Sequence, residues 1–324
     1  MLAALAGGVG AARFLAGLVR VRPPEHLTAI VNTADDEEFH GLHVAPDLDS
    51  VTYTLAGASD PVQGWGLAGE SFRVLEALGR YDAPTWFRLG DRDLATHLYR
   101  SERLRSGAPL SLVTAEIAGA WGLGFTLLPM TDDRVRTRIT VRRPTGDTTE
   151  LAMQEWFVRE RCEPPVVSVR FDGAATARPA PGVIEAIERA ETIVICPSNP
   201  VISIGPILAI PGVRDALVAR RDRVVAVSPI VAGAPVKGPA DRLMGPLGLD
   251  VSCVGVAAAY REFCATLVID AADAARADEV EAQGVRAVVT DTMMVGPEVA
   301  AVLADTTLAA VRSEEHTSEL QSRG

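Results

Sequence analysis

The sequence has one lysine, few cysteines and a negative net charge, and its composition argues against several classes of protein. Lys237 is the only lysine among 31 basic residues, and the formal net charge of -11 argues against a nucleic-acid-binding protein. No apolar run reaches the roughly 20 residues of a membrane-spanning helix. The cysteines show no CxxC spacing, so neither a zinc site nor a disulfide framework is indicated: Cys162, Cys196, Cys253 and Cys264. We therefore expect a cytoplasmic protein that binds neither nucleic acid nor membrane.

The two ends of the sequence are interpreted differently. The apolar start, MLAALAGGVGAARFLAGL, lacks the basic leading segment of a signal peptide and is interrupted by Arg13 and four glycines, so we include it in the fold. The end, SEEHTSELQSRG, differs from everything before it and resembles translated adapter or vector sequence. Residues 313–324 are therefore predicted to be a non-native tail.

Short β-branched runs alternate with helix-like segments along most of the chain. The expected strands are 2–6, 27–32, 166–171, 192–196, 223–228, 265–270 and 285–291. This alternation predicts an α/β fold with a Rossmann-like, doubly wound parallel sheet. Residues 60–125 lack strand patterns and predict a small all-helical insertion domain, so the core comprises residues 1–59 and 126–312. A hairpin over residues 136–155, turning at PTGD, is expected to extend the sheet.

A glycine-rich segment, GGVGAARF, follows the first expected strand. Glycines at this place let the backbone approach a phosphate, which the N–H groups opening the next helix can bind, so Gly8 and Gly10 are candidate ligand contacts. The dinucleotide pattern GxGxxG is incomplete, because Arg13 stands where its third glycine would be. Arg13 can instead bind a phosphate through two hydrogen bonds. A tight structural turn is the alternative interpretation.

Carboxylates are concentrated where the second expected strand ends. Asp35 and Asp36 follow LTAIVNTA, and PDLD places Asp47 and Asp49 ahead of a helix-like run. Asp47 can cap that helix, and Asp49 would lie in its first turn, where the dipole favours a negative charge. Four carboxylates converging from two loops would repel one another without a cation, and hard oxygen ligands beside phosphates suit Mg²⁺. The sequence therefore predicts a magnesium site here.

The segment GDRDLATH carries a second group of polar side chains. Asp93 and His97 are four residues apart and share one face of an expected helix, while Arg92 at its start can reach a ligand. Routine ion pairs on a surface helix are the alternative. His40 and His43 lie near the acidic stretch without a third nitrogen or sulfur ligand for zinc, so we interpret them as hydrogen-bonding orienters.

Two later loops follow expected strands directly. Ser198 and Asn199 come after TIVIC, where exposed N–H groups, a hydroxyl and an amide can read a phosphate or a base. SPIVAGAPVKGPAD repeats this arrangement in a glycine- and proline-rich loop that carries Lys237. Neither a P-loop, GxxxxGK[ST], nor a nucleophile elbow occurs in the chain.

Seven blocks of this chain together resemble the 2-phospho-L-lactate transferase family of coenzyme F-420 biosynthesis, whose bacterial form is a phosphoenolpyruvyl transferase. The blocks are GGVGAARF, NTADD, HGLHVAPDLDSVTYTL, LGDRDLATHLYRS, QEWFVR, PSNPVISIGPIL and SPIVAGAPVKGPAD. The resemblance implies a Rossmann-like homodimer with a small helical domain. It also implies transfer of a phosphoester-bearing group from guanosine diphospho-lactate or guanosine diphospho-enolpyruvate to the ribityl hydroxyl of a deazaflavin precursor, with release of GMP.

The resemblance also implies roles for individual residues. Deazaflavin contacts carry over onto Asp49 and Arg92, and magnesium-binding positions onto Asp35 and its neighbours. Our hypothesis places Mg²⁺ on Asp35 and Asp47, with Asp36 as a further acidic candidate in catalysis. Asp49 would position the ribityl hydroxyl and accept its proton. The remaining candidates would hold the phosphates and the guanylate: Gly8, Gly10, Arg13, Ser198, Asn199 and Lys237.

Two other functions share parts of these patterns. Proteins of the gluconeogenesis-factor group resemble this chain in glycine loop and fold, yet bind nucleotide sugars; their acidic loop continues into a Gly/Ser-rich segment, whereas EEFHGLHVAPDLD stands here. A nicotinamide oxidoreductase is disfavoured by Arg13 and by the doubled Asp35 and Asp36. Between the two guanosine donors, which differ by one unsaturation, the blocks GDRDLATHL and SIGPILAIPG favour the enolpyruvyl form.

Overall fold

A computed structural model describes residues 1–321, with side chains described through residue 311. Its centre is a seven-stranded parallel sheet in the order β14-β13-β10-β9-β1-β2-β5. Strand order reverses between β1 and β9, so the sheet is doubly wound and the predicted α/β class is confirmed. The strands are β1 (Leu2–Ala6), β2 (Leu27–Val31), β5 (Thr126–Pro129), β9 (Thr192–Ile195), β10 (Val224–Val227), β13 (Thr266–Asp270) and β14 (Arg286–Thr290).

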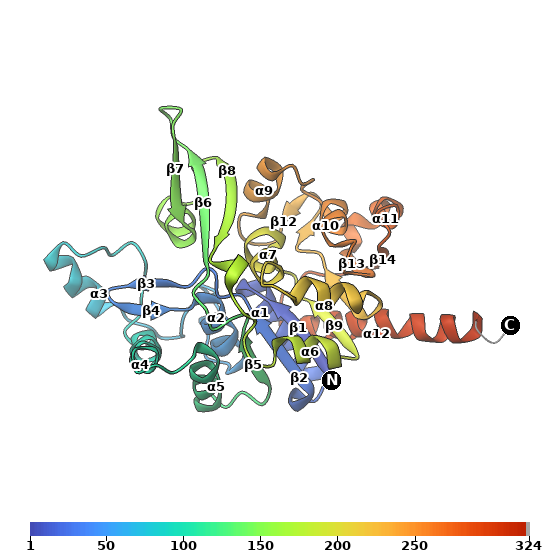
Figure 1. Ribbon diagram of the computed structural model, residues 1–324, viewed down its shortest axis with the longest axis horizontal. Coiled ribbons are helices and arrows are strands. Elements are labelled where there is room, and N and C mark those ends of the chain that lie inside the picture. The colour runs from blue at the N-terminus through green and yellow to red at the C-terminus, as the bar shows by residue number, and fades with distance from the viewer. Residues whose placement is uncertain (322–324) are drawn as a thin grey trace.

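Helices cover both faces of this sheet and give the molecule three layers (Figure 1). Successive residues of a strand point to opposite faces, so Ala3 and Leu5 of β1 join one apolar cluster while Leu2 and Ala4 join the other. The first cluster includes α6 (Val183–Arg189), α8 (Val213–Ala219) and α10 (Cys253–Tyr260). The second includes α1 (Gly8–Val21), α2 (Pro46–Leu55), α5 (Leu110–Ala120) and α12 (Pro297–Gln321). Burial on both faces accounts for the continuous apolar runs of the strands.

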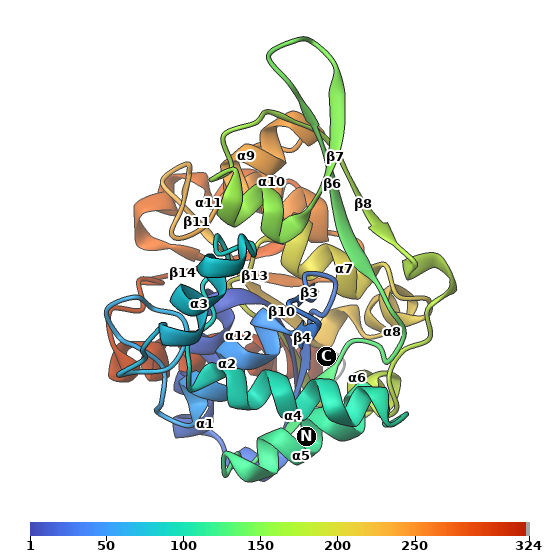
Figure 2. The same ribbon diagram turned by 90° about the vertical axis from the view of Figure 1, so that its left-hand side faces the viewer.

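The predicted hairpin forms, but it does not extend the central sheet. β6 (Arg136–Arg142) pairs antiparallel with β7 (Thr148–Ala152) and with β8 (Val166–Asp172) in a separate three-stranded sheet. This sheet projects from the body of the molecule (Figure 2). The assignment of 166–171 to the parallel core was therefore wrong. Ser168 and Arg170 alternate with apolar residues, as in a strand with one solvated face.

The region between α2 and β5 is helical but contains less helix than predicted. It has α3 (Arg73–Leu78), α4 (Asp93–Arg105) and α5, and the segment between α2 and α3 is a loop. Gly64, Gly66 and Gly69 adopt positive φ angles of 71°, 70° and 67°, which interrupt any helix there. A short hairpin, β3 (Glu37–Phe39) and β4 (Leu42–Val44), was not expected. The domain limits themselves stay predictions.

The last helix packs against the first. Gly17 of α1 lies so close to α12 that a Cβ added there would come within 2.3 Å of the Ala300 backbone. The predicted non-native tail begins within α12 at residue 313, and its last residues, 322–324, lie outside the described part of the chain. Over residues 1–321 no single helix is long and apolar enough to cross a membrane; one bent pair, Pro200–Leu208 with Val213–Ala219, meets that criterion by length and composition only.

Candidate active site at the carboxyl edge of the sheet

A cavity of about 700 Å³ opens beside the carboxyl ends of β1, β2 and β9. This is the point of strand-order reversal at which doubly wound sheets bind ligands. The cavity brings together residues from segments far apart in sequence. Eleven of the candidate residues line it: Gly8, Gly10, Arg13, Asp35, Asp47, Asp49, Asp93, His97, Ser198, Asn199 and Lys237. Asp36 and Arg92 do not line it.

The glycine loop joins β1 to α1 and packs tightly against the loop after β9. A Cβ added to Gly10 would lie 2.5 Å from the Pro197 carbonyl oxygen, so only glycine fits without a backbone shift. Gly8 has a φ of 74°, a conformation that other residues rarely adopt. The Ser198 hydroxyl donates to the Gly7 carbonyl at 2.9 Å. These contacts fix the first helical N–H groups at the cavity wall, where an anion can bind.

Arg13 and Lys237 supply two cations to the cavity from opposite halves of the sheet. Neither has an ion-pair partner among the side chains that the structure describes. Both lie near Gly64, where an added Cβ would be 2.9 Å from Lys237 Nζ and 3.6 Å from Arg13 Nη2. Burial and the neighbouring Arg13 charge lower the pKa of Lys237. Two unpaired, mutually repelling cations at one wall favour an anionic ligand such as a phosphate ester.

Asn199 begins the helical turn Pro200–Ile204 after β9. Its Oδ1 accepts hydrogen bonds from the Val201 and Ile202 N–H groups at 2.9 and 3.3 Å. This pairing fixes the side-chain amide, whose buried Nδ2 has no hydrogen-bond partner among the described residues. The Nδ2 group is therefore a donor available to a ligand in the cavity.

Asp35 and Asp47 meet at Asn32, the residue that directly follows β2. The Asn32 amide Nδ2 donates to Asp35 Oδ2 at 3.1 Å and to Asp47 Oδ2 at 3.0 Å. Burial, reinforced by the Asp47 charge, raises the pKa of Asp35 well above its ordinary value. Burial also raises the pKa of Asp47 to about 6, although the Asn32 amide and the Gly8 N–H oppose the rise. Asp47 does not cap α2, because Ala45 occupies the N-cap position.

This acidic pair fits a hard divalent cation. Asp35 Oδ1 is buried and has no hydrogen-bond partner among the described residues, so a lone pair is left unmatched beside Asp47. An unpaired buried carboxylate is unfavourable unless a cation or a proton compensates it. Oxygen ligands of this kind suit Mg²⁺.

Asp36 points away from the cavity lining toward the β3–β4 hairpin. His43 Nε2 lies 2.8 Å from Asp36 Oδ2, so His43 is a partner of the acidic stretch, as expected. Arg136, whose pKa is lowered by burial, also lies in the field of Asp36. Asp36 thus lies outside the cavity lining, next to Asp35 in the sequence, and supports the site without facing a ligand.

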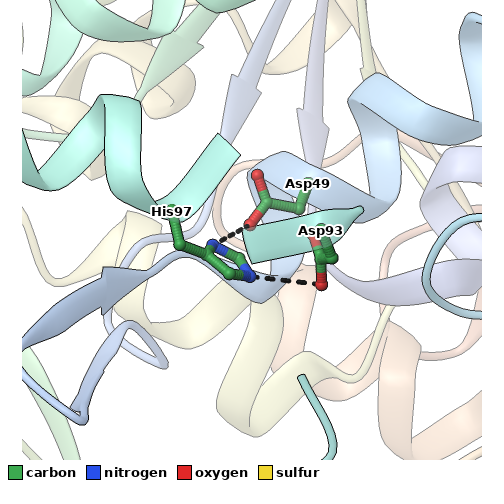
Figure 3. A group of neighbouring side chains, drawn as sticks. All are labelled: Asp49, Asp93 and His97. Atoms are coloured by element: carbon green, nitrogen blue, oxygen red, sulfur yellow. Dashed lines mark ion pairs between the residues drawn. The ribbon is translucent and has the colours of Figure 1, made fainter. Parts of the chain in front are cut away.

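A second buried polar cluster surrounds Asp49 (Figure 3). His97 Nδ1 lies 3.7 Å from Asp49 Oδ2, and His97 Nε2 lies 3.1 Å from Asp93 Oδ2, confirming that Asp93 and His97 share a face of α4. Arg100 binds both carboxylate oxygens of Asp49, one through Nη1 at 3.2 Å and the other through Nη2. The Tyr53 hydroxyl donates to Asp93 Oδ1 at 2.5 Å.

Aromatic side chains form another part of the cavity wall. Trp65, Trp86, Phe87 and Phe157 line it together with Tyr53. Phe87 stacks on Phe39 with ring centroids 4.1 Å apart, which holds the Trp86–Phe87 segment in place. A wall of this kind can bind a flat ring system through stacking and apolar contact.

The sequence model of 2-phospho-L-lactate transferase CofD matches residues 2–307. This chain belongs to that family. Curated relatives named phosphoenolpyruvate transferase include one from Streptomyces griseus, 44% identical over 93% of this chain and 95% of its own length. Another, from Thermobifida fusca, is 45% identical over 92% of this chain and 90% of its own.

A solved structure of a Bacillus halodurans protein of the UPF0052 family is similar in fold to this CofD-family chain. Its TM-score is 0.61 at 17% identity, and the match covers 95% of this chain and 98% of that one. At this identity the likeness concerns the fold alone. Both the family and its named relatives are transferases, so this chain belongs to a transferase family.

Sequence reasoning missed three residues of this CofD-family site. Asn32 bridges the acidic pair, Arg100 binds Asp49, and Tyr53 bonds to Asp93. A signal for Arg100 was present, because it stands seven residues after Asp93 and therefore on the same helical face. Arg92, by contrast, is exposed, and its guanidinium donates to the Ala68 carbonyl oxygen.

Proposed function

We propose that this protein transfers a phosphoenolpyruvyl group from a guanosine diphospho-intermediate to the ribityl hydroxyl of 7,8-didemethyl-8-hydroxy-5-deazariboflavin, in coenzyme F-420 biosynthesis. The observation that carries the proposal is one cavity combining unpaired cations, buried carboxylates and an aromatic wall. A 2-phospholactyl donor has the same anionic groups, and the relatives named phosphoenolpyruvate transferase favour the enolpyruvyl form.

The donor would bind at the glycine loop and its cations. Arg13 and Lys237 would neutralise the diphosphate, and the N–H groups at the start of α1 would bind its oxygens. The unpaired Nδ2 of Asn199 would donate to the guanylate part, beside Ser198. This assignment gives a ligand to the unpaired donors of Arg13, Lys237 and Asn199.

Asp35 and Asp47 would hold Mg²⁺, with Asp36 supporting them through its neighbouring position and its His43 partner. The ion supplies Lewis-acid polarisation of phosphoryl oxygens and charge neutralisation. Asn32 keeps the two carboxylates together at 3.1 and 3.0 Å from its Nδ2, which reduces the reorganisation that cation binding requires.

The deazaflavin would stack on the aromatic wall with its ribityl chain toward Asp49. The ribityl hydroxyl oxygen attacks the phosphorus, the bond from phosphorus to the GMP oxygen breaks, and Asp49 accepts the hydroxyl proton. Arg100 uses one lone pair on each Asp49 oxygen, so other lone pairs remain for the substrate. Arg92 would contact the deazaflavin after its side chain turns from the Ala68 carbonyl.

The test incubates purified protein, Mg²⁺ and the deazaflavin with each synthetic guanosine donor, and follows products by mass spectrometry. We expect the phosphoenolpyruvyl adduct and GMP. Asp49→Asn should lower kcat by ~10²–10⁴, the range of a lost general base. Absence of product with either donor, together with nucleotide-sugar binding, would replace the proposal with a binding function. Light scattering would test the homodimer that the proposal includes.

A further inference from the structure

The Asp49 cluster contains a group that could be mistaken for a metal site. One ligand atom from each of Asp49, Asp93 and His97 lies within 4.8 Å of the others, as in a two-carboxylate, one-histidine site (Figure 3). Arg100, however, already lies at this group. Its guanidinium contacts both Asp49 oxygens, and Nη1 is also 3.3 Å from His97 Nδ1.

Arg100 and Asp93 each lie next to one ring nitrogen of His97. A guanidinium only donates, so the His97 Nδ1 that faces Arg100 is an acceptor. The other ring nitrogen, Nε2, lies 3.1 Å from Asp93 Oδ2. Tyr53 donates to the other oxygen of Asp93. Arg100 is therefore the cation in direct contact with Asp49, and the Asp93 carboxylate lies between the Tyr53 hydroxyl and His97.

We propose that Arg100 is the positioning residue for Asp49, holding its carboxylate against the cavity and serving as the resident cation of the Asp49, Asp93 and His97 cluster in place of a metal ion. This inference rests on the proposed function of Asp49. Arg100 is 2% exposed, and it is absent from the cavity lining, so it acts through Asp49 without touching a ligand. Burial raises the pKa of Asp49, and the Arg100 charge opposes that rise.

The geometry of the contact with Asp49 requires an arginine at position 100. Two parallel N–H donors hold both oxygens of a carboxylate in one orientation, whereas a lysine ammonium is a point charge that fixes only its distance. Loss of Arg100 would leave Asp49 buried, able to rotate and without its cation. A misplacement of about 1 Å at a reacting group lowers turnover by roughly 10²-fold.

The experiment compares Arg100→Gln, Arg100→Lys, Asp49→Asn and the double variant Arg100→Gln with Asp49→Asn in steady-state assays. We expect Arg100→Gln to lower kcat by roughly 10²-fold with little change in the KM of the guanosine donor. Arg100→Lys should recover only part of the loss. The double variant should be no slower than Asp49→Asn alone, because both changes remove one function. Arg103→Gln, on the exposed side of α4 where Arg103 pairs with Glu116, is the matched control.

Three results would overturn the inference. Turnover of Arg100→Gln equal to that of the wild type, or losses that add in the double variant, would show that Arg100 does not act through Asp49. Co²⁺ titration gives an independent measurement: we expect identical visible spectra for the wild type and His97→Asn, and a histidine-dependent band would identify a metal site instead. If the wild type itself gives no product, the proposed function fails, which is a different outcome from a wild type that turns over with an insensitive Arg100.

Discussion

Asn32→Asp should make the stability of the protein depend on a cation bound at the carboxylate pair of the cavity. Asn32 is fully buried, and its Nδ2 donates to Asp35 and Asp47 at 3.1 and 3.0 Å. The substitution replaces this donor with a third carboxylate oxygen. Two hydrogen bonds to charged acceptors are lost, at ~1.5–3 kcal/mol each, so the free energy of unfolding should fall by ~3–6 kcal/mol without Mg²⁺.

The corresponding change in melting temperature can be worked out from the length of the chain. An unfolding entropy of about 2.1 cal/mol/K per residue gives roughly 0.7 kcal/mol/K for 324 residues. The Tm of Asn32→Asp should therefore be ~4–9 °C below that of the wild type in EDTA. Mg²⁺ should recover more of this loss than it adds to the wild type, because the third carboxylate attracts the cation.

Thermal unfolding by circular dichroism, with and without Mg²⁺, measures both quantities. Asn32→Ala is the matched control: it removes the same donor without adding charge, so its Tm should respond to Mg²⁺ as that of the wild type does. A Tm for Asn32→Asp within about 1 °C of the wild type in EDTA would refute the assigned role of Asn32. So would an equal response of both variants to Mg²⁺.

Three other predictions concern pH, backbone packing and charge at the same cavity. The pKa of Asp47 is raised from 3.8 to about 6 in the folded state. Without Mg²⁺, the free energy of unfolding should therefore rise by up to about 3 kcal/mol as the pH falls through 6 toward 4. Urea titrations would measure this pH dependence, and Mg²⁺ should flatten it. Gly10→Ala should lower the free energy of unfolding by ~1–3 kcal/mol, because its Cβ meets the Pro197 carbonyl oxygen at 2.5 Å, and calorimetry would measure the loss. Lys237→Gln should raise the KM of the guanosine donor by ~10–100-fold, the equivalent of one charged hydrogen bond, while deazaflavin fluorescence reports unchanged acceptor binding. An unaltered donor KM would remove Lys237 from the phosphate site.

The parallel core could be predicted from sequence because its strands are buried on both faces. Runs such as LTAIV and TIVIC are continuous and apolar, and β2 and β9 form where these runs indicated. Segment 166–171 has the same β-branched character, yet Arg170 and Ser168 face outward in a separate sheet. Strand propensity predicts an extended chain but not its partner. β5 was missed because it is short and ends at a proline, Pro129.

The candidate site was predictable where residues follow strand ends or share a helical turn. Ser198 follows β9, and Asp93 and His97 are four residues apart, so local spacing was enough. Asn32 and Arg100 were missed because their partners are distant in sequence: Arg100 is 51 residues from Asp49, and Asn32 is 15 from Asp47. Helical spacing places Arg100 on the same face as Asp93, but it carries no information about the pairing of Arg100 with Asp49.

The packing of α12 on α1 couples the glycine loop to a residue near the other end of the chain. Gly17 leaves no gap beside the Ala300 backbone, and α1 begins at the glycine loop itself. A bulkier residue at position 17 would push one helix from the other, and the end of α1 that carries Gly8 and Gly10 would move with it. Positions 17 and 300 should therefore vary in concert among relatives, and loss-of-function substitutions should occur at this helix crossing although neither residue lines the cavity.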